Sequence, residues 1–150
     1  MNNADYKYED IVEAVKKVGI QKDDVLFSYS NIGFFGKMHN AESINDYCSA
    51  FKKAIFEVIG DDGTLVVPTF SYSFCNNKTF DKNKTPSVCG VFTEYIRKHQ
   101  DAKRSNEPNF SISAIGKHTE FFTKNQPSHP FDKDSFWERF LIKNGKFLNL

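Results

Sequence analysis

The sequence has few of the features that would assign it directly to a functional class. Three cysteines occur in 150 residues; they are far apart and form no C-x-x-C pair, which argues against a disulfide framework or a zinc knuckle. The four histidines show no H-x-x-x-H spacing, so we expect no metal site. The G-x-S-x-G, P-loop and G-x-G-x-x-G patterns are missing as well. The sequence therefore shows none of the common motifs for a serine nucleophile or for a phosphate-binding loop.

The sequence also lacks an excess of charge of either sign. Lys and Arg number 20 against 19 Asp and Glu, which leaves a net charge of +1. The sequence therefore lacks the excess of basic residues that is typical of proteins that bind nucleic acid or an anionic membrane. No segment approaches the ~20 apolar residues of a membrane span. The first ten residues, MNNADYKYED, do not have the layout of a signal peptide. We therefore expect a cytoplasmic protein that holds any anionic ligand with a local cluster.

What the sequence does contain is an alternation of helix-type and strand-type patterns. Apolar residues at helical spacing predict helices over residues 9–18, 44–59, 87–98 and 135–144, with a short helix after Gly116. Runs rich in β-forming residues predict strands over residues 25–30, 64–67, 110–115 and 146–150. This alternation is typical of a single α/β domain, residues 1–150, with a mostly parallel sheet covered by helices on both faces.

Two stretches stand out against this alternation. Residues 70–88 show no period and predict a long loop, a feature that often carries function. Residues 146–150 read as an apolar strand with no helix after it, although a strand inside a parallel sheet needs cover on both faces. We therefore expect a domain that is incomplete at its C-terminus. The alternative is a short edge strand.

The stretch RSNEPNFSISAIG, residues 104–116, is the best candidate for ligand chemistry. Arg104 offers a planar fork suited to phosphate, and three serines add hydroxyl groups nearby. By pattern alone, however, this stretch could equally be a polar loop that leads into a strand.

Three ordered motifs carry a family resemblance. They are GTLVVPTFSYSF (63–74), FDKNKTPSVCGVFTEYIR (80–97) and RSNEPNFSISAIG (104–116), and in order and spacing they resemble the aminoglycoside 3-N-acetyltransferase family. The resemblance extends to SYSNIG (28–33) and KFLNL (146–150), so it covers nearly the whole chain. It implies a three-layer α/β/α sandwich that transfers acetyl from acetyl-CoA, used as a co-substrate without a metal, to an amino group of an aminoglycoside or related amino sugar.

The resemblance also implies roles for particular residues. By position, Ser30 and Asn31 would border the pantetheine or phosphate region of CoA, and Thr69 and Phe70 would lie near the thioester. The resemblance implies that the nucleotide end of CoA is bound by Arg104, Ser105, Ser111 and Ser113. The implied contacts to a cationic amino sugar are Tyr72, Asp81 and Glu94, for which packing, turn and helix roles are the alternatives.

The sequence departs from the family pattern in three places. Glu107 and Ser28 stand where the family commonly has histidine. The family's catalytic His and Glu would fall beyond Leu150, so we assign no catalytic residue. Two other interpretations therefore stay open, namely a truncated, inactive fragment that retains at most partial CoA binding, and a binding module completed by a second chain. The sequence leaves the oligomeric state open.

Overall fold

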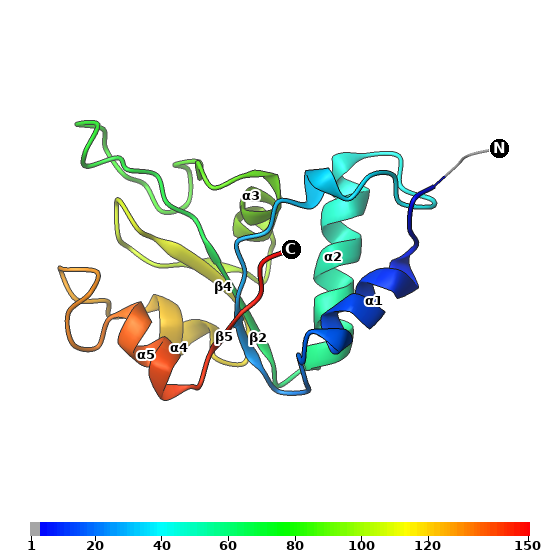
Figure 1. Ribbon diagram of the computed structural model, residues 1–150. Helices are drawn as coiled ribbons and strands as arrows, with labels where there is room; N and C mark the ends of the chain where they lie inside the picture. The colour runs from blue at the N-terminus through cyan, green and yellow to red at the C-terminus, as the bar shows by residue number, and fades with distance from the viewer. Residues whose placement is uncertain (1–3) are drawn as a thin grey trace.

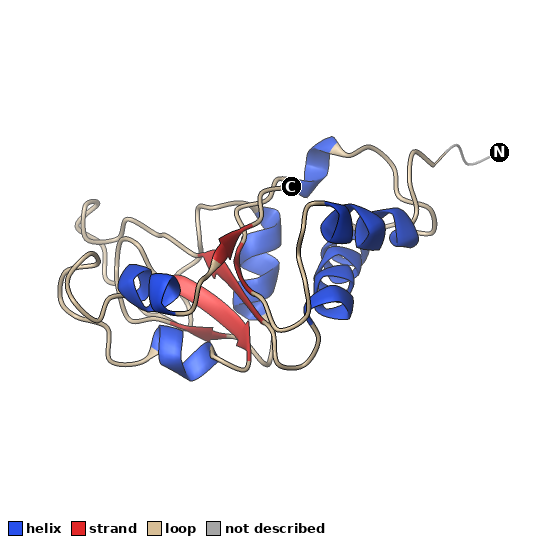
Figure 2. Cartoon of the chain, turned by 60° about the horizontal axis from the view of Figure 1, so that its bottom comes forward, coloured by secondary structure: helices blue, strands red, loops and turns tan. Residues whose placement is uncertain are grey.

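The computed structural model of the protein describes residues 4–150, and these residues build one five-stranded sheet with helices packed on it (Figures 1 and 2). The sheet order is β3-β4-β2-β1-β5. The strands are β1 (Val25–Phe27), β2 (Thr64–Pro68), β3 (Lys103–Arg104), β4 (Ile112–Gly116) and β5 (Lys146–Phe147). The helices are α1 (Tyr8–Lys17), α2 (Ile44–Ile59), α3 (Val91–Lys98), α4 (Thr119–Thr123) and α5 (Phe136–Ile142), with a 3-10 turn, η1 (Ile32–Phe34).

The sheet is mixed, so the expectation of a mostly parallel sheet is wrong. Strand β1 pairs in parallel with β2 and β5, whereas β4 pairs antiparallel with both β2 and β3. The cause is β3, a two-residue strand too short to show an alternating pattern in the sequence. The chain leaves α3 through β3, turns over residues 105–111, and returns as β4 between β3 and β2. This hairpin reverses the direction that a simple helix crossover would have given.

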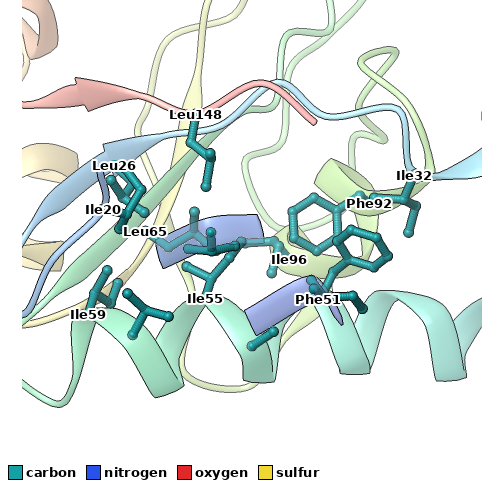
Figure 3. Close-up of a cluster of buried hydrophobic side chains, with 14 of the residues drawn as sticks. Ile20, Leu26, Ile32, Phe51, Ile55, Ile59, Leu65, Phe92, Ile96 and Leu148 are labelled. Atoms are coloured by element: carbon teal, nitrogen blue, oxygen red, sulfur yellow. The ribbon is translucent and has the colours of Figure 1, made fainter. Parts of the chain in front are cut away.

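Apolar side chains of the central strands alternate between two cores. Leu26 and Leu65 pack with α1, α2 and α3 in one cluster, which Figure 3 shows. Phe27 and Val66 point the other way, into a cluster with α4 and α5. Because both faces are covered, every residue of β1 and β2 is buried. Each large side chain buried in this way contributes roughly 1.5–3 kcal/mol.

The long predicted helix is confirmed and is closed at both ends by its own residues. The hydroxyl of Ser43 accepts a hydrogen bond from the backbone N–H of Asp46, and the carboxylate of Asp46 accepts one from the N–H of Ser43. At the other end Gly60 takes a φ of 69° and donates to the carbonyl of Phe56. Helix α2 is thereby fixed as the platform on which α1 packs.

The predicted third helix, residues 87–98, starts later than its sequence pattern indicates. Helix α3 begins at Val91 and not at residue 87, because Gly90 has a φ of 107°, outside the helical region. Residues 70–88 contain no helix or strand, as predicted. The last segment is regular only over β5, and it stays beside β1 through hydrogen bonds from Leu148 to Phe27 and from Asn31 to Leu150.

None of the helices described in residues 4–150 has both the length and the apolar character needed to cross a membrane.

Candidate functional site

The segment that follows β1 is held rigidly by neighbouring strands. The N–H of Ser28 donates to the carbonyl of Val66, and the hydroxyls of Ser28 and Ser30 lie 2.6 Å apart in a buried pair. The hydroxyl of Ser30 also accepts a hydrogen bond from the N–H of Leu150, whose carbonyl accepts one from the N–H of Asn31. Ser30 is therefore fixed in position, while the side chain of Asn31 is exposed beside it.

The start of α3 lies opposite this segment, and no side chain caps it. Gly90 occupies the N-cap position, and a Cβ placed on it would meet nothing within 4 Å. The loop before it is anchored, because Val88 donates to the carbonyl of Phe70 and Cys89 donates to the hydroxyl of Ser87. The loop therefore fixes the start of α3, and the first backbone N–H groups of the helix have no intrahelical hydrogen-bond acceptor. Such a helix start carries partial positive charge and suits phosphate.

A cavity of about 340 Å³ lies between these two segments. Ser30, Asn31 and Gly33 line one side, and residues 88–92 line the other. A larger, more open hollow of about 810 Å³ shares Val88, Gly90 and Val91 and continues along α3 past Glu94. The start of α3 thus forms the wall between two adjoining spaces, one narrow and one wide.

Glu94, predicted to meet substrate, is occupied by its own neighbours. Its two oxygens accept hydrogen bonds from Nε and Nη2 of Arg97, each at 2.7 Å, and Oε2 also accepts the N–H of Ser87. Burial alone would raise the pKa of this carboxyl, but the bonds from Arg97, Ser87 and Lys98 outweigh it and lower the pKa to about 2. This charged group fixes the loop before α3.

Arg104 forms the centre of a buried network. Its guanidinium donates to the carbonyls of Thr69 and Thr85 and, through Nε, to the hydroxyl of Ser111. Burial, followed by the nearby charge of Arg97, lowers the pKa of Arg104 to about 10. This network joins the end of β2 to β3, β4 and the long loop.

The predicted hydroxyl residues lie in or next to the same network. Ser111 donates to the carbonyl of Thr69, Ser113 donates to the hydroxyl of Thr69, and Ser105 accepts from the N–H of Ile112. All four side chains are buried. Of the eight predicted cofactor residues, Ser30 and Asn31 therefore line the narrow cavity. Five others are buried and do not line this cavity, so their contact with CoA stays a prediction. They are Thr69, Arg104, Ser105, Ser111 and Ser113.

Phe70, the eighth residue, belongs to an aromatic cluster with Tyr72 and Phe110. The ring centroids are 5.4–6.2 Å apart and meet edge to face. Tyr72 is partly exposed and has a φ of 52°, in the left-handed region that bulky residues rarely adopt. At the base of the neighbouring loop, Glu107 accepts the backbone N–H groups of Asn109 and Phe110.

The three predicted substrate residues belong to separate groups of contacts. Tyr72 lies in the aromatic cluster, and Glu94 is bound to Arg97. Asp81 accepts the N–H groups of Asn83 and Lys84 and so closes a turn in the long loop. Their contact with a substrate remains a prediction.

Residues 88–92, which line the narrow cavity, are not among the site residues predicted from the sequence. The motif that contains them was recognised, but no role was given to Gly90 or to the amides that follow it. The available signal was a glycine directly before an apolar helical repeat, where a Ser, Thr, Asp or Asn cap is usual. Among residues 4–150, no group of three or more His, Cys, Asp or Glu side chains is arranged to hold a metal ion.

Comparison with known proteins places this geometry in context. The sequence model of the family described as aminoglycoside 3-N-acetyltransferase matches residues 28–150. The SPbeta prophage-derived aminoglycoside N(3')-acetyltransferase-like protein YokD of Bacillus subtilis (strain 168) is 26% identical over 132 residues, which cover 73% of this chain and 46% of YokD.

Solved structures show the same fold. The aminoglycoside acetyltransferase AAC(3)-IVa, as apoenzyme, gives a TM-score of 0.84 at 21% identity, covering 100% of this chain and 56% of that one. The structure described as AAC-IIIb binary with CoASH gives 0.81 at 19% identity, covering 97% and 59%. YokD from Bacillus subtilis gives 0.80 at 23% identity, covering 95% and 64%. The chain thus spans about half the length of these relatives.

Proposed function

Because the chain belongs to the aminoglycoside 3-N-acetyltransferase family, we propose that it takes part in transferring an acetyl group from acetyl-CoA to an amino group of an aminoglycoside or related amino sugar. The reaction takes place in the cytoplasm. The helices on both faces of the sheet support the three-layer α/β/α sandwich of such an enzyme.

The observation that carries the proposal is the uncapped start of α3 facing Ser30 and Asn31. Phosphate groups need donors that are fixed in direction and positive in potential, and the first amides of α3 meet both needs. The open space at Gly90 lets an anion approach the backbone closely, where a Cβ would stand in the way. These residues therefore fit the pyrophosphate of CoA.

The remaining cavity wall suits the pantetheine arm. The amide groups of pantetheine need hydrogen-bond partners along a narrow channel. The hydroxyl of Ser30 and the exposed side chain of Asn31 supply such partners, and apolar Ile32 and Phe92 lie beside them. Acetyl-CoA, when bound, supplies the acetyl group as a reactive thioester. The chain's own residues bind and orient this carrier.

Removal of a proton from the acceptor ammonium is not assigned to any described residue. Only the neutral amine is nucleophilic, so the reaction requires a base. Of residues 4–150, those lining the narrow cavity include no histidine or carboxylate. We therefore propose that this chain holds the acyl carrier, and we assign no general base among the residues that line the narrow cavity.

The acceptor is proposed from the aromatic cluster and from the ligands named for related structures. One is described as AAC-VIa bound to sisomicin, and another contains AAC(3)-IVa with apramycin. Tyr72 is 38% exposed and packs edge to face with Phe70 and Phe110, so its ring offers a π face to a cationic amino sugar.

A charge placed at the first position of α3 tests the CoA site. Val91 is 56% exposed, so Val91→Asp keeps the fold and favours the helix start, yet it sets a carboxylate against the pyrophosphate. We expect the Kd for CoA to rise roughly tenfold by calorimetry. Val91→Asn, similar in shape but neutral, should stay within about twofold of the parent value. Equal binding by the two variants would remove the phosphates from this position.

A further inference from the structure

A third pocket, of about 390 Å³, lies at the outer edge of the sheet, and cationic residues make up most of its lining. It is enclosed by the C-terminal end of α3, by β3, by the long loop and by the end of α4. Six of its nine lining residues are cationic: Lys82, Arg97, Lys98, Lys103, Arg104 and Lys124. Since the whole chain has a net charge of only +1, this is a local concentration of positive charge.

Neighbouring acids neutralise only part of this charge. Glu94 is shared by Arg97 and Lys98, and Glu120 is shared by Lys103 and Lys124. Two carboxylates thus face six cations, which leaves an excess positive charge in a concave site. Such an arrangement raises the local concentration of anions.

The two arginines of the pocket are fixed in place. Arg97 is held by both oxygens of Glu94 and by the carbonyl of Asn83. Arg104 is held by its network of carbonyls, and its guanidinium stacks over the ring of Phe80 at 4.9 Å. Their mutual repulsion lowers the pKa of Arg104, in addition to the effect of burial. An anion between them would relieve that repulsion without any rearrangement of the pocket.

The lysines at the rim supply mobile donors. In residues 4–150, no hydrogen bond or ion pair engages the ammonium of Lys82. Lys98 is 67% exposed and contacts Glu94 at 3.3 Å, which leaves donors free. A lysine ammonium acts as a point charge with three donors, well suited to close over a compact oxyanion.

This pocket is separate from the narrow cavity at the start of α3, although Lys98 also lines the wide hollow that runs along the helix. No residue lines both the pocket and the narrow cavity. Helix α3 runs from one to the other, and its eight residues span about 12 Å.

We propose that this basic pocket binds a phosphate group, either as inorganic phosphate or as the phosphate monoester of a nucleotide. The arginines provide a rigid, positively charged wall, and Lys82 and Lys98 provide donors that close over the ligand. The inference rests on no residue of the narrow cavity, but it shares Arg104 with the residues that the family resemblance implies at the nucleotide end of CoA.

The test is a titration of the 150-residue chain with inorganic phosphate at constant ionic strength, with chloride as the reference anion, followed by amide NMR. We expect saturating shifts at residues 82–83, 97–98 and 103–104. The double substitution Lys82→Gln/Lys98→Gln should weaken phosphate binding roughly tenfold or more. It leaves the pair between Glu94 and Arg97 intact, so the fold should be kept.

The matched control is Lys17→Gln/Lys53→Gln, which removes the same charge from exposed positions on α1 and α2. It should bind phosphate as the parent does. Absence of saturating shifts in the parent, or an equal loss in both double variants, would overturn the proposal.

A comparison of CoA with dephospho-CoA distinguishes the two sources of phosphate. If the pocket takes the nucleotide's monoester, CoA binds more tightly than dephospho-CoA, and Lys82→Gln/Lys98→Gln abolishes that difference. If it takes free phosphate, the two carriers bind alike and phosphate still titrates in the presence of CoA. Either result supports a phosphate pocket, provided that the phosphate titration itself saturates.

Discussion

At the scale of single residues, the buried charges show how the loops are held. Arg104 and Glu94 both lie in motifs that the sequence displays clearly, and both were assigned to ligands from those motifs. In the structure each is surrounded by partners of its own chain. A sequence motif does not reveal the long-range hydrogen-bond partners of its residues. Many of these partners are backbone carbonyl groups of distant loops, which are present whatever the side chain and so form no sequence pattern. This is why the contacts that Arg104 and Glu94 make within the chain could not be predicted from the motifs.

The charge on Glu94 makes stability depend on pH. Its pKa of about 2 lies below the ordinary value of 4.5, so its contribution is complete above the unfolded pKa and is lost as pH falls from about 5 towards 2. Glu94→Gln should therefore reduce the free energy of unfolding by roughly 2 kcal/mol at pH 7. Urea denaturation of parent and variant should give curves that converge by about pH 2–3.

The pH-dependent difference between parent and variant is the relevant quantity, since other carboxylates also have lowered pKa values. Asp46 and Asp62 are two of these, and they are unchanged in the variant. A difference that stays constant from pH 7 to pH 3 would show that Glu94 does not act through its charge.

At the scale of elements, the helices were more predictable than the sheet. Helix α2 has a long apolar repeat with a serine cap and a glycine stop, and it was found almost residue for residue. Strand β3 has only two residues, too few for any period, and its omission produced the wrong sheet direction. Strand pairing depends on contacts between distant segments, which single-sequence patterns do not record.

The antiparallel pairing of β4 with β2 requires a residue without a Cβ at Gly116. This residue has a φ of 117°, and a Cβ on it would lie 2.2 Å from the carbonyl oxygen of Gly63. Gly116→Ala should therefore cost about 3 kcal/mol or more by urea denaturation, through both strain and overlap. Gly19→Ala, at a φ of 88° with open space around it, is the matched control and should cost only about 1 kcal/mol.

Equal costs for the two glycine variants would contradict the close approach of β4 to the turn before β2. The pairing of Thr64 with Gly116 sets the register of the whole antiparallel ladder. A small cost at Gly116 would therefore argue against this register and for a different arrangement of β4.

At the scale of the whole molecule, α3 links the two proposed ligand sites. Its first turn faces the narrow cavity after β1, and its last turn faces the basic pocket beside β3. The family resemblance gave the acetyltransferase fold and drew attention to Ser30 and Asn31. It did not identify the backbone amides of α3, since amides are present at every position of a sequence. The sequence thus predicted the family and suggested Ser30 and Asn31 as CoA contacts, and the structure places the start of α3 across the cavity from them.

The most direct test of the CoA site is an amide NMR titration of the 150-residue chain with CoA. We predict that the largest shifts fall on the backbone N–H groups of Val91 and Phe92, with further shifts at Ser30 and Asn31, because these line the two walls of the cavity. Unchanged amides at the start of α3 under saturating CoA, with shifts confined to residues 104–113, would contradict the proposed site.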